Sequence, residues 1–322
     1  MAAQFPPRFG GHDDCTSLDQ LSLTLRESVH IVSVMSATLA EIDSQLDVWA
    51  NSEVMRVAGQ LPGRGARVGA IGCGTSLHVV QSYAAFREQS GHGTTDAFAA
   101  SLAPARDWDF LIALSRSGTT TEVLNAVRAS IAGKTIALTA SEQSPISHEV
   151  DVTWAIPFAD ERSIVQTRFA TTALLALLAS VDYPIHRSLE DGSREIASLP
   201  PAVIDGRSHF VFVGAGWTHG IANEAALKLR EMAHCWAESY PAMEFRHGPI
   251  SASGPETLLW GFGPRDESLA SAVASTGATV HWPDCDPVAS LVEVQRLGLR
   301  LAARGDNDPD KPRHLARSVI LG

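Results

Sequence analysis

Lysine is almost missing from this sequence of 322 residues, in which Lys134, Lys228 and Lys311 are the only lysines and arginine supplies the other basic side chains. Chemistry that needs an amine, such as Schiff-base formation with a carbonyl, therefore has few residues available. Positive charge is also in the minority, because 25 basic residues face 36 acidic ones and the formal net charge is −11. This balance disfavours binding to nucleic acid or to an anionic membrane surface, but it permits a local pocket for a small anion.

Cysteine is scarce as well, and it shows neither CxxC spacing nor a cluster with histidines. The four cysteines are Cys15, Cys73, Cys235 and Cys285. A zinc site or a disulfide framework is therefore not indicated, and nothing in the sequence points to a metal or an organic cofactor. No secretory signal is visible at the N-terminus, and the longest apolar run, residues 170–181, is too short for a membrane span. We expect a cytoplasmic protein.

What is present is a globular composition, with 45% hydrophobic and 19% charged residues, and a length that favours two domains. Residues 17–50 show helical spacing, and from residue 68 short apolar runs alternate with helical patterns. The expected strands are 68–71, 94–98, 110–114, 135–139, 152–156, 209–213, 257–262 and 279–282. The expected helices are 76–89, 120–131, 166–180, one from about 219, 267–275 and 287–303. This alternation predicts an α/β fold of parallel sheets with helices on both faces.

A weak internal duplication divides the pattern into two halves. The stretch from Val68 to Thr75, a strand followed by Gly-Cys-Gly-Thr, aligns with Phe210 to Trp217, a strand followed by Gly-Ala-Gly-Trp. A polar segment with a Pro-Pro pair at residues 188–201 lies between the two halves. We therefore expect two sheets of the same type in tandem.

Two polar turns follow expected strands of the first half, where open α/β sheets bind their ligands. One turn contains Gly74, Thr75 and Ser76, and the other is the segment Ser115-Arg-Ser-Gly-Thr-Thr120. Both turns precede helices, so their backbone N–H groups and hydroxyls favour a phosphate. The simpler alternative is that these serines and threonines only cap helices. A dinucleotide fingerprint is excluded, because the third glycine of G-x-G-x-x-G would fall at Leu77.

The second half carries a denser polar set. Glu224, Lys228 and Glu231 have the spacing of one helix face, and His247 follows in a His-Gly-Pro turn. A solvated ladder of salt bridges is the ordinary meaning of such spacing, and a lone histidine is usually structural. Carboxylates beside a histidine on a loop suit proton transfer on a sugar, so both interpretations stay open.

The sequence resembles the sugar isomerase (SIS) domain proteins, and among them the tandem-SIS isomerase half of the glucosamine-6-phosphate synthases. The matching stretches are 73–76, 115–120, 223–231, 237–240, 244–249 and 312–319. Residues 161–172 also resemble a segment of stand-alone tandem-SIS proteins that isomerise or deaminate amino-sugar phosphates, although they read equally well as a capped buried helix. The resemblance implies two flavodoxin-like SIS domains at 51–195 and 196–303. It also implies an N-terminal arm with helices at 1–50 and a C-terminal tail over the active site at 304–322.

The resemblance assigns roles to individual residues. The sugar 6-phosphate would be held by Ser76, Ser115, Ser117, Thr120 and the backbone N–H of Arg116, with Gly74, Thr75 and Arg317 also near the substrate. Glu231 would move a proton between C1 and C2 through an enediol(amine), while Glu224 and Lys228 orient the sugar or the base. His247 would assist ring opening from a neighbouring subunit, which implies a homodimer with shared active sites.

One departure from the resemblance concerns Schiff-base chemistry. The synthases have a lysine where this sequence has Arg317, and arginine is not a usable amine at neutral pH. Lys311 could substitute only if the tail shifts. We therefore expect an isomerase or isomerising deaminase for an amino-sugar or ketosamine 6-phosphate. The rival hypothesis is a non-catalytic sugar-phosphate sensor, which would have the phosphate turn without the carboxylates and the histidine.

Overall fold

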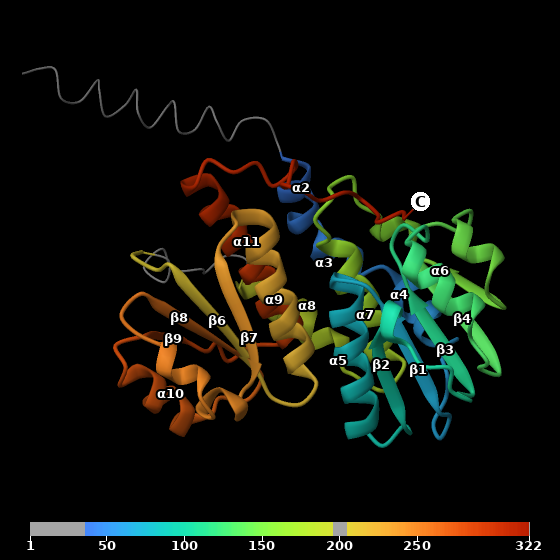
Figure 1. Ribbon diagram of the computed structural model, residues 1–322, viewed down its shortest axis with the longest axis horizontal. Helices are drawn as coiled ribbons and strands as arrows, with labels where there is room; N and C mark the ends of the chain where they lie inside the picture. The colour runs from blue at the N-terminus through green and yellow to red at the C-terminus, as the bar shows by residue number, and fades with distance from the viewer. Residues whose placement is uncertain (1–35, 196–204, 322) are drawn as a thin grey trace, which may run out of the picture. The chain divides into compact units, whose positions relative to one another are not determined.

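The computed structural model of the protein describes residues 36–195 and 205–321. The predicted N-terminal arm, most of the helical pattern at 17–50 and the Pro-Pro pair at 200–201 lie outside these described residues. Two parallel sheets with helices packed against them make up the described part of the chain (Figure 1). The predicted α/β class is therefore confirmed.

The first sheet has five parallel strands in the order β2-β1-β3-β4-β5, which is the flavodoxin-like order. The strands are β1 (Val68–Gly72), β2 (Thr95–Ala99), β3 (Phe110–Leu114), β4 (Lys134–Thr139) and β5 (Val152–Ala155). In register, Val68 of β1 lies opposite Thr95 of β2 and Phe110 of β3. The carboxyl ends of β1 and β3 therefore lie side by side, and so do the turns that follow them.

The second sheet has four parallel strands in the order β7-β6-β8-β9. The strands are β6 (His209–Gly214), β7 (Trp236–Pro241), β8 (Thr257–Phe262) and β9 (Thr279–His281). Its order repeats that of the first sheet with one strand fewer, as the internal duplication predicted.

Helices cover both faces of each sheet. The α-helices are α2 (Ala37–Asp43), α3 (Gln45–Trp49), α4 (Ser52–Ala58), α5 (Thr75–Gln89), α6 (Thr121–Arg128), α7 (Arg168–Ala179), α8 (Ile185–Glu195), α9 (Thr218–Ala233), α10 (Glu267–Ala274) and α11 (Pro287–Arg304). On the first sheet α4, α5 and α7 share one apolar core and α6 belongs to another. On the second sheet α9 and α11 cover one face, and α10 covers the other. None of the described helices is both long and apolar enough to cross a membrane.

One continuous core joins the two sheets. It contains Val68 and Ile112 of the first sheet, Phe210 and Trp260 of the second, and the buried faces of the helices between them. Helices α5 and α9 pack against each other at its centre (Figure 1). The residues at the α5–α9 contact therefore belong to both halves of the duplication.

The two halves turn from strand to helix in the same way. A Cβ added to Gly72 would lie 2.6 Å from the backbone of Ser76, and one added to Gly214 would lie 2.3 Å from the carbonyl oxygen of Thr218. Two residues later, Gly74 and Gly216 have φ values of 55° and 56°. These positions require glycine, because the helix start comes too close for a side chain and the next turn needs a left-handed backbone.

Several elements differ from the sequence predictions. Strand β7 was not predicted, because it is an edge strand whose polar residues Glu238 and Ser239 hide the strand pattern. Helix α6 ends at Arg128 rather than near residue 131. The described part of the expected helix at 17–50 is broken at Ser44, and the short helix α4, which begins after the capping side chain of Asn51, was missed.

Candidate functional site

The two predicted phosphate turns lie at the point where the first sheet reverses its winding. Strands β1 and β3 are neighbours, but the helices that follow them, α5 and α6, pack on opposite faces of the sheet. Ligands of open α/β sheets bind in the crevice that this arrangement creates. Gly74, Thr75 and Ser76 form one side of the crevice and the segment 115–120 forms the other.

The 115–120 turn is closed by its own hydrogen bonds. The N–H of Gly118 donates to the carbonyl and the hydroxyl of Ser115, at 3.2 and 3.1 Å. The N–H and the hydroxyl of Thr119 donate to the hydroxyl of Ser117, at 3.2 and 3.0 Å. Gly118 has a φ of 63°, and a Cβ there would lie 2.4 Å from the hydroxyl of Ser144. The serines therefore shape the turn itself rather than cap a helix, and Ser117 and Thr120 stay partly exposed.

Ser76 and Thr120 occupy the first turn of α5 and the N-cap of α6. The side chain of Thr120 accepts no capping hydrogen bond from α6, and Ser76 lies inside α5, whose N-cap is Gly74. Ser76 is 4% exposed. The hydroxyl of Thr120 lies 3.4 Å from that of Ser318 in the C-terminal tail. Helix capping therefore does not account for these two hydroxyls, and the N-terminal ends of both helices point their N–H groups at the same crevice.

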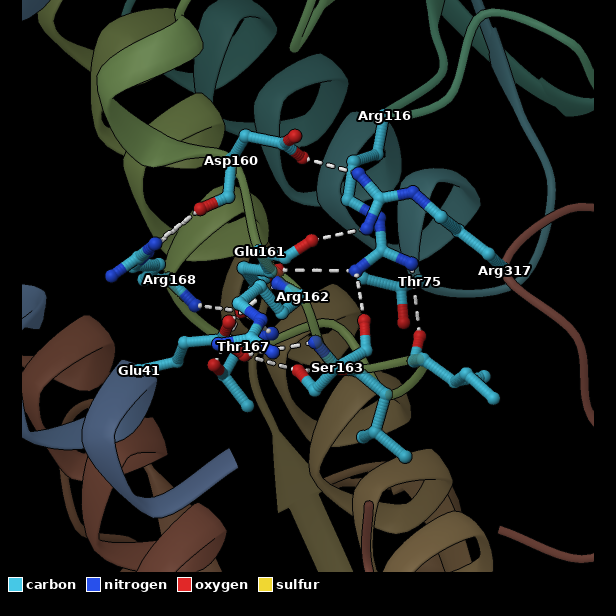
Figure 2. Close-up of polar contacts among 12 residues, drawn as sticks. Glu41, Thr75, Arg116, Asp160, Glu161, Arg162, Ser163, Thr167, Arg168 and Arg317 are labelled. Atoms are coloured by element: carbon cyan, nitrogen blue, oxygen red, sulfur yellow. Dashed lines mark hydrogen bonds and ion pairs between the residues drawn. The ribbon is translucent and has the colours of Figure 1, made fainter. Parts of the chain in front are cut away.

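The side chain of Arg116 turns away from the crevice and is buried. Its guanidinium donates to the carbonyl oxygens of Ser163 and Ile164, at 2.9 and 3.0 Å, and lies 3.5 Å from the carboxylate of Glu161 (Figure 2). Burial lowers the pKa of Arg116, and the carboxylate of Glu161 opposes that change. Only the backbone of Arg116 is left to face a ligand in the turn.

Two buried carboxylates hold the loop that precedes α7. Glu161 accepts hydrogen bonds from the backbone N–H groups of Thr167 and Arg168, at 2.7 and 2.8 Å, and from the hydroxyl of Thr167. Glu41 accepts from the backbone N–H and the hydroxyl of Ser163 and from the N–H of residue 162 (Figure 2). Since Glu161 satisfies the first N–H groups of α7, residues 168–172 of this segment are part of the capped buried helix that the sequence allowed, whereas residues 161–167 form the loop before it.

Glu224, Lys228 and Glu231 face the first half of the chain from α9. The Lys228 ammonium is fully buried and lies 3.3 Å from Glu224 and 2.5 Å from Glu231. It also donates to the hydroxyl of Thr75 at 3.0 Å, and that hydroxyl donates to Glu224 at 3.2 Å. The interpretation as a solvated ladder was therefore wrong, because Glu224 and Lys228 are buried and only Glu231 is partly open, with 18% of its side chain exposed.

The charges of this cluster are strongly coupled. Burial raises the pKa of Glu224 to about 7, although Lys228 lowers it. Burial also works against the charge of Lys228, but the carboxylates of Glu224 and Glu231 outweigh it and raise the pKa of Lys228 above its usual value. The cluster therefore keeps a protonated lysine beside a carboxyl group that titrates near neutral pH, which suits proton transfer.

His247 is not brought together with Glu231. Helix α9 runs back along the second sheet from the carboxyl end of β6, so Glu231, near the end of α9, lies toward the amino ends of the strands. His247 follows a short 3₁₀ helix, Glu244–Arg246, beyond the carboxyl end of β7, and it is exposed. The predicted turn is confirmed, but within one chain its imidazole lies at the opposite end of the second sheet.

The C-terminal tail lies against the 115–120 turn. The hydroxyl of Thr119 donates to that of Ser318 at 2.8 Å, and the N–H of Thr121 donates to the carbonyl oxygen of Val319 at 3.2 Å. Arg317 donates to the carbonyl oxygen of Glu161 and pairs with Asp160 at 2.6 Å (Figure 2). The tail is thus tied to both the turn and the loop before α7.

Lys311 is engaged elsewhere. Its side chain is 84% exposed, and its ammonium lies 3.3 Å from Asp308. Neither Lys311 nor the guanidinium of Arg317 therefore presents an amine to the crevice. The buried Lys228 is the lysine that the described structure joins to Thr75.

Sequence reasoning missed three residues that contact the predicted site. Ser318 was covered only by the general resemblance of the tail, and Asp160 precedes the matched stretch at 161–172. His78, about one turn after Thr75 on α5, is half-buried beside α9, and burial lowers its pKa to about 4. A search for polar residues one helical turn beyond each phosphate turn would have found His78. Among the described residues, no group of three metal-ligating side chains gathers.

Comparisons with known proteins bear on the resemblance that the sequence predicted. Residues 204–276 match the SIS domain family. The chain is 28% identical over 294 residues to a glutamine–fructose-6-phosphate aminotransferase (isomerizing) of Sulfurisphaera tokodaii, covering 79% of this chain and 50% of that protein. A second such protein, from Gloeobacter violaceus, is 31% identical over 179 residues, 46% of this chain and 29% of the relative. The chain spans about half the length, or less, of these curated relatives.

The solved structures match most of this chain and nearly all of their own chains. The glucosamine-6-phosphate deaminase of Thermotoga maritima is 26% identical, with a TM-score of 0.77 over 89% of this chain and 100% of the other. A tagatose-6-phosphate ketose/aldose isomerase of Escherichia coli is 20% identical with a TM-score of 0.70, which supports the fold alone. The predicted resemblance is thus confirmed.

Proposed function

We propose, from the premise that residues 204–276 of this chain are an SIS domain, that the protein is a phosphosugar isomerase or isomerising deaminase. Its substrate would be an amino-sugar or ketosamine 6-phosphate, converted through an enediol(amine) by proton transfer between C1 and C2. We further propose that the chain carries two SIS domains, at 51–195 and 196–303, and that the tail at 304–322 covers the active site.

One observation carries this proposal: the hydroxyl of Thr75 joins the phosphate crevice to the charged face of α9. Thr75 bonds both Lys228, at 3.0 Å, and Glu224, at 3.2 Å, and it lies directly before Ser76. A sugar held by its 6-phosphate beside Ser76 would place its other carbons toward this cluster. A sensor needs the phosphate crevice but has no use for a buried lysine between two carboxylates, so the cluster favours an enzyme.

In the proposed reaction the hydroxyls of Ser76, Ser115, Ser117 and Thr120 and the backbone N–H of Arg116 hold the phosphate. Glu231, the partly exposed carboxylate, takes the proton from one carbon and returns it to the next. Lys228 and Glu224 fix the position and charge of Glu231. Gly74 and Thr75 line the path between the two groups.

The cited relatives that share more than 25% of their residues with this chain are a glucosamine-6-phosphate deaminase and glutamine–fructose-6-phosphate aminotransferases, so we propose an amino sugar as the substrate. The deaminase of Thermotoga maritima matches along its whole length, whereas the aminotransferases match over about half of theirs. Because Arg317 replaces an amine and Lys311 pairs with Asp308, we do not include an imine on the tail in the proposal.

The position of His247 favours a shared site. Within one chain it lies at the end of the second sheet away from Glu231, and it is exposed. We propose that it opens the sugar ring in the site of a second copy, in a cytoplasmic homodimer. Mixing a Glu231→Gln chain with a His247→Asn chain should restore activity in mixed dimers, while each variant alone stays inactive.

A substrate panel tests the function. Hexose, hexosamine and ketosamine 6-phosphates are assayed for ammonia release and for aldose–ketose exchange, with Glu231→Gln as the control. Turnover of at least one amino-sugar phosphate by the wild type is expected. Thermal stabilisation by a sugar phosphate without conversion would instead support the sensor.

A further inference from the structure

A small cavity lies at the contact between α5, α7 and α9, behind the proposed site. It has a volume of about 10 Å³ and touches Glu224. The other residues around it are His78, Val79, Ser82, Ala170, Thr171, Leu174, Gly220, Ile221 and Leu291. This volume is at the lower end of what one water molecule occupies, on the order of 10–15 Å³. An apolar cavity of this size stays dry, so its polar lining decides whether it holds water.

Two lining residues point to a ligand. Oε2 of Glu224 and the hydroxyl of Ser82 are both buried, and neither has a hydrogen-bond partner among the described residues. A buried polar atom without a partner is destabilising, and more so when the group is charged. The hydroxyl of Thr171, by contrast, already bonds Gln45 at 2.7 Å and Trp49 at 3.1 Å. The unmet hydrogen bonds of the cavity therefore belong to Glu224 and Ser82.

The hydrogen bonds of His78 fix which ring nitrogen is protonated. Asn223 donates its amide N–H to Oε1 of Gln81 at 3.1 Å, so that oxygen acts as an acceptor. Nδ1 of His78 lies 3.3 Å from the same oxygen and must therefore carry the hydrogen. Nε2 is left with a lone pair, at a residue that lines the cavity.

We propose that this cavity binds one ordered water that accepts a hydrogen bond from Ser82 and donates one each to Oε2 of Glu224 and Nε2 of His78. Three bonds are the usual number for a buried water. Helices α5 and α9 also cross closely at this cavity, because a Cβ on Gly220 of α9 would lie 2.3 Å from the Ser82 hydroxyl of α5.

The water has a consequence for the reaction, and this step rests on the proposed function. By donating to the carboxylate, it stabilises the charged form of Glu224 against burial. The groups that face Glu224 are Thr75, His78 and Ser82 of α5, Lys228 and Glu231 of α9, and Thr171 of α7, with Leu291 of α11 closing the cavity. His78 and Ser82 are therefore positioning residues that act through the water on Glu224, and through Glu224 on Lys228 and Glu231.

Two measurements test the water site without any activity. In the ¹⁵N-histidine NMR spectrum of the full chain, assigned with His78→Gln, we expect His78 to be neutral with its hydrogen on Nδ1 between pH 6 and 8. A crystal structure at high resolution should show a water within hydrogen-bond distance of Glu224 and Ser82. A hydrogen on Nε2, or an empty cavity, would overturn the proposal.

Kinetics test the positioning role. Ser82→Ala removes one partner of the water, whereas Thr172→Val removes a buried hydroxyl of α7 that has no described partner and does not line the cavity. We expect Ser82→Ala to move the acid limb of the kcat–pH profile upward by about one pH unit with KM unchanged, and Thr172→Val to leave it in place. If Ser82→Ala and the wild type have the same kcat–pH profile, Ser82 is not a positioning residue. If the wild type converts no substrate, the proposed function fails, while the spectrum and the water density still decide the site.

Discussion

The molecule buries two charged clusters that differ in how completely their carboxylate oxygens are hydrogen-bonded. The first cluster holds the loop before α7 and consists of Glu161, in that loop, and Glu41, on α2. Both oxygens of each carboxylate have partners, which are backbone N–H groups, hydroxyls and Arg116. On α9, Glu224 has partners on Oε1 only, and Glu231 is partly open to solvent. The two clusters contain the same kinds of side chains, but only the first is closed.

The difference separates a structural cluster from the cluster that we propose to be reactive. A carboxylate whose hydrogen bonds are all made is fixed in position, so it can hold a loop, although burial raises the pKa of Glu161 as it raises that of Glu224. A carboxylate with an unmet oxygen, or with an open edge beside a lysine, can still exchange a proton. Burial alone therefore does not identify a catalytic group, and what sets the α9 cluster apart is an unpartnered carboxylate oxygen together with a lysine and a partly exposed carboxylate.

The sharpest test of this comparison is Glu231→Gln. The amide keeps the shape of the side chain but cannot accept a proton, so we expect turnover to fall by a factor of about a thousand or more, with little change in KM or in the melting temperature. Steady-state kinetics and thermal unfolding measure both. Retained activity would remove Glu231 from the reaction and leave the α9 cluster structural.

Glu161→Gln should mainly lower the stability of the fold, whereas Glu231→Gln should mainly lower turnover. Removing one charge of a buried pair leaves Arg116 without its ionic partner, so we expect a loss of about 3–5 kcal/mol in the free energy of unfolding. Urea titration measures the loss. The control is Glu149→Gln, which breaks a surface pair with Arg128 and should cost far less stability. Equal costs for both variants would mean that the loop cluster is not a structural clamp.

The pH dependence of stability should distinguish Glu224 from a carboxylate that stays ionised in the folded state at every pH. Its folded pKa of about 7 lies above the unfolded value of about 4.3, so the folded state holds a proton that the unfolded chain has lost. The stabilising contribution is therefore complete below about pH 4 and disappears as the pH rises through 7. Glu224→Gln has no such titration, so its unfolding free energy relative to wild type should rise by on the order of 2 kcal/mol from pH 5 to pH 8.

Urea titrations of the Glu224→Gln variant and the wild type at several pH values test that difference. A difference that stays constant with pH would show that Glu224 is ionised throughout, like an ordinary closed ion pair.

Arg317→Gln should have the smallest effect on stability, because the Arg317–Asp160 pair is about 40% exposed. We expect a loss below about 1 kcal/mol. The substitution also loosens the tail beside the 115–120 turn, so KM for a sugar phosphate should rise several-fold while kcat changes less. Arg56→Gln, which breaks an exposed pair with Glu53, is the control and should change neither constant. An unchanged KM in Arg317→Gln would separate the tail from the site.

Local patterns predicted most of the fold. The buried parallel strands are continuous apolar runs, and the helices between them have clear spacing, so both sheets were expected. The edge strand β7 was missed, because half of it faces solvent and its sequence, Trp-Ala-Glu-Ser-Tyr-Pro, carries no such run. The break at Ser44 was missed because the apolar spacing continues across it.

The site was predicted as two separate pieces. The phosphate turns and the α9 face each follow from residue spacing, but their junction does not. Thr75 meets Lys228 and Thr119 meets Ser318 across long stretches of chain, and no local pattern encodes such contacts. The inward orientation of the Arg116 side chain could not be predicted either. The sequence shows an arginine in a polar turn, but it does not show that the carbonyl groups of Ser163 and Ile164 lie close enough to accept its hydrogen bonds.

The single core that joins both sheets restricts how this chain can change. Because α5 and α9 pack on each other as well as on their own sheets, a substitution on that contact is felt by both halves at once. The halves share a strand order, but neither can be exchanged for a foreign copy unless the surface of its neighbour is rebuilt to match. Grafting one half onto another scaffold therefore requires that the facing helix be redesigned with it.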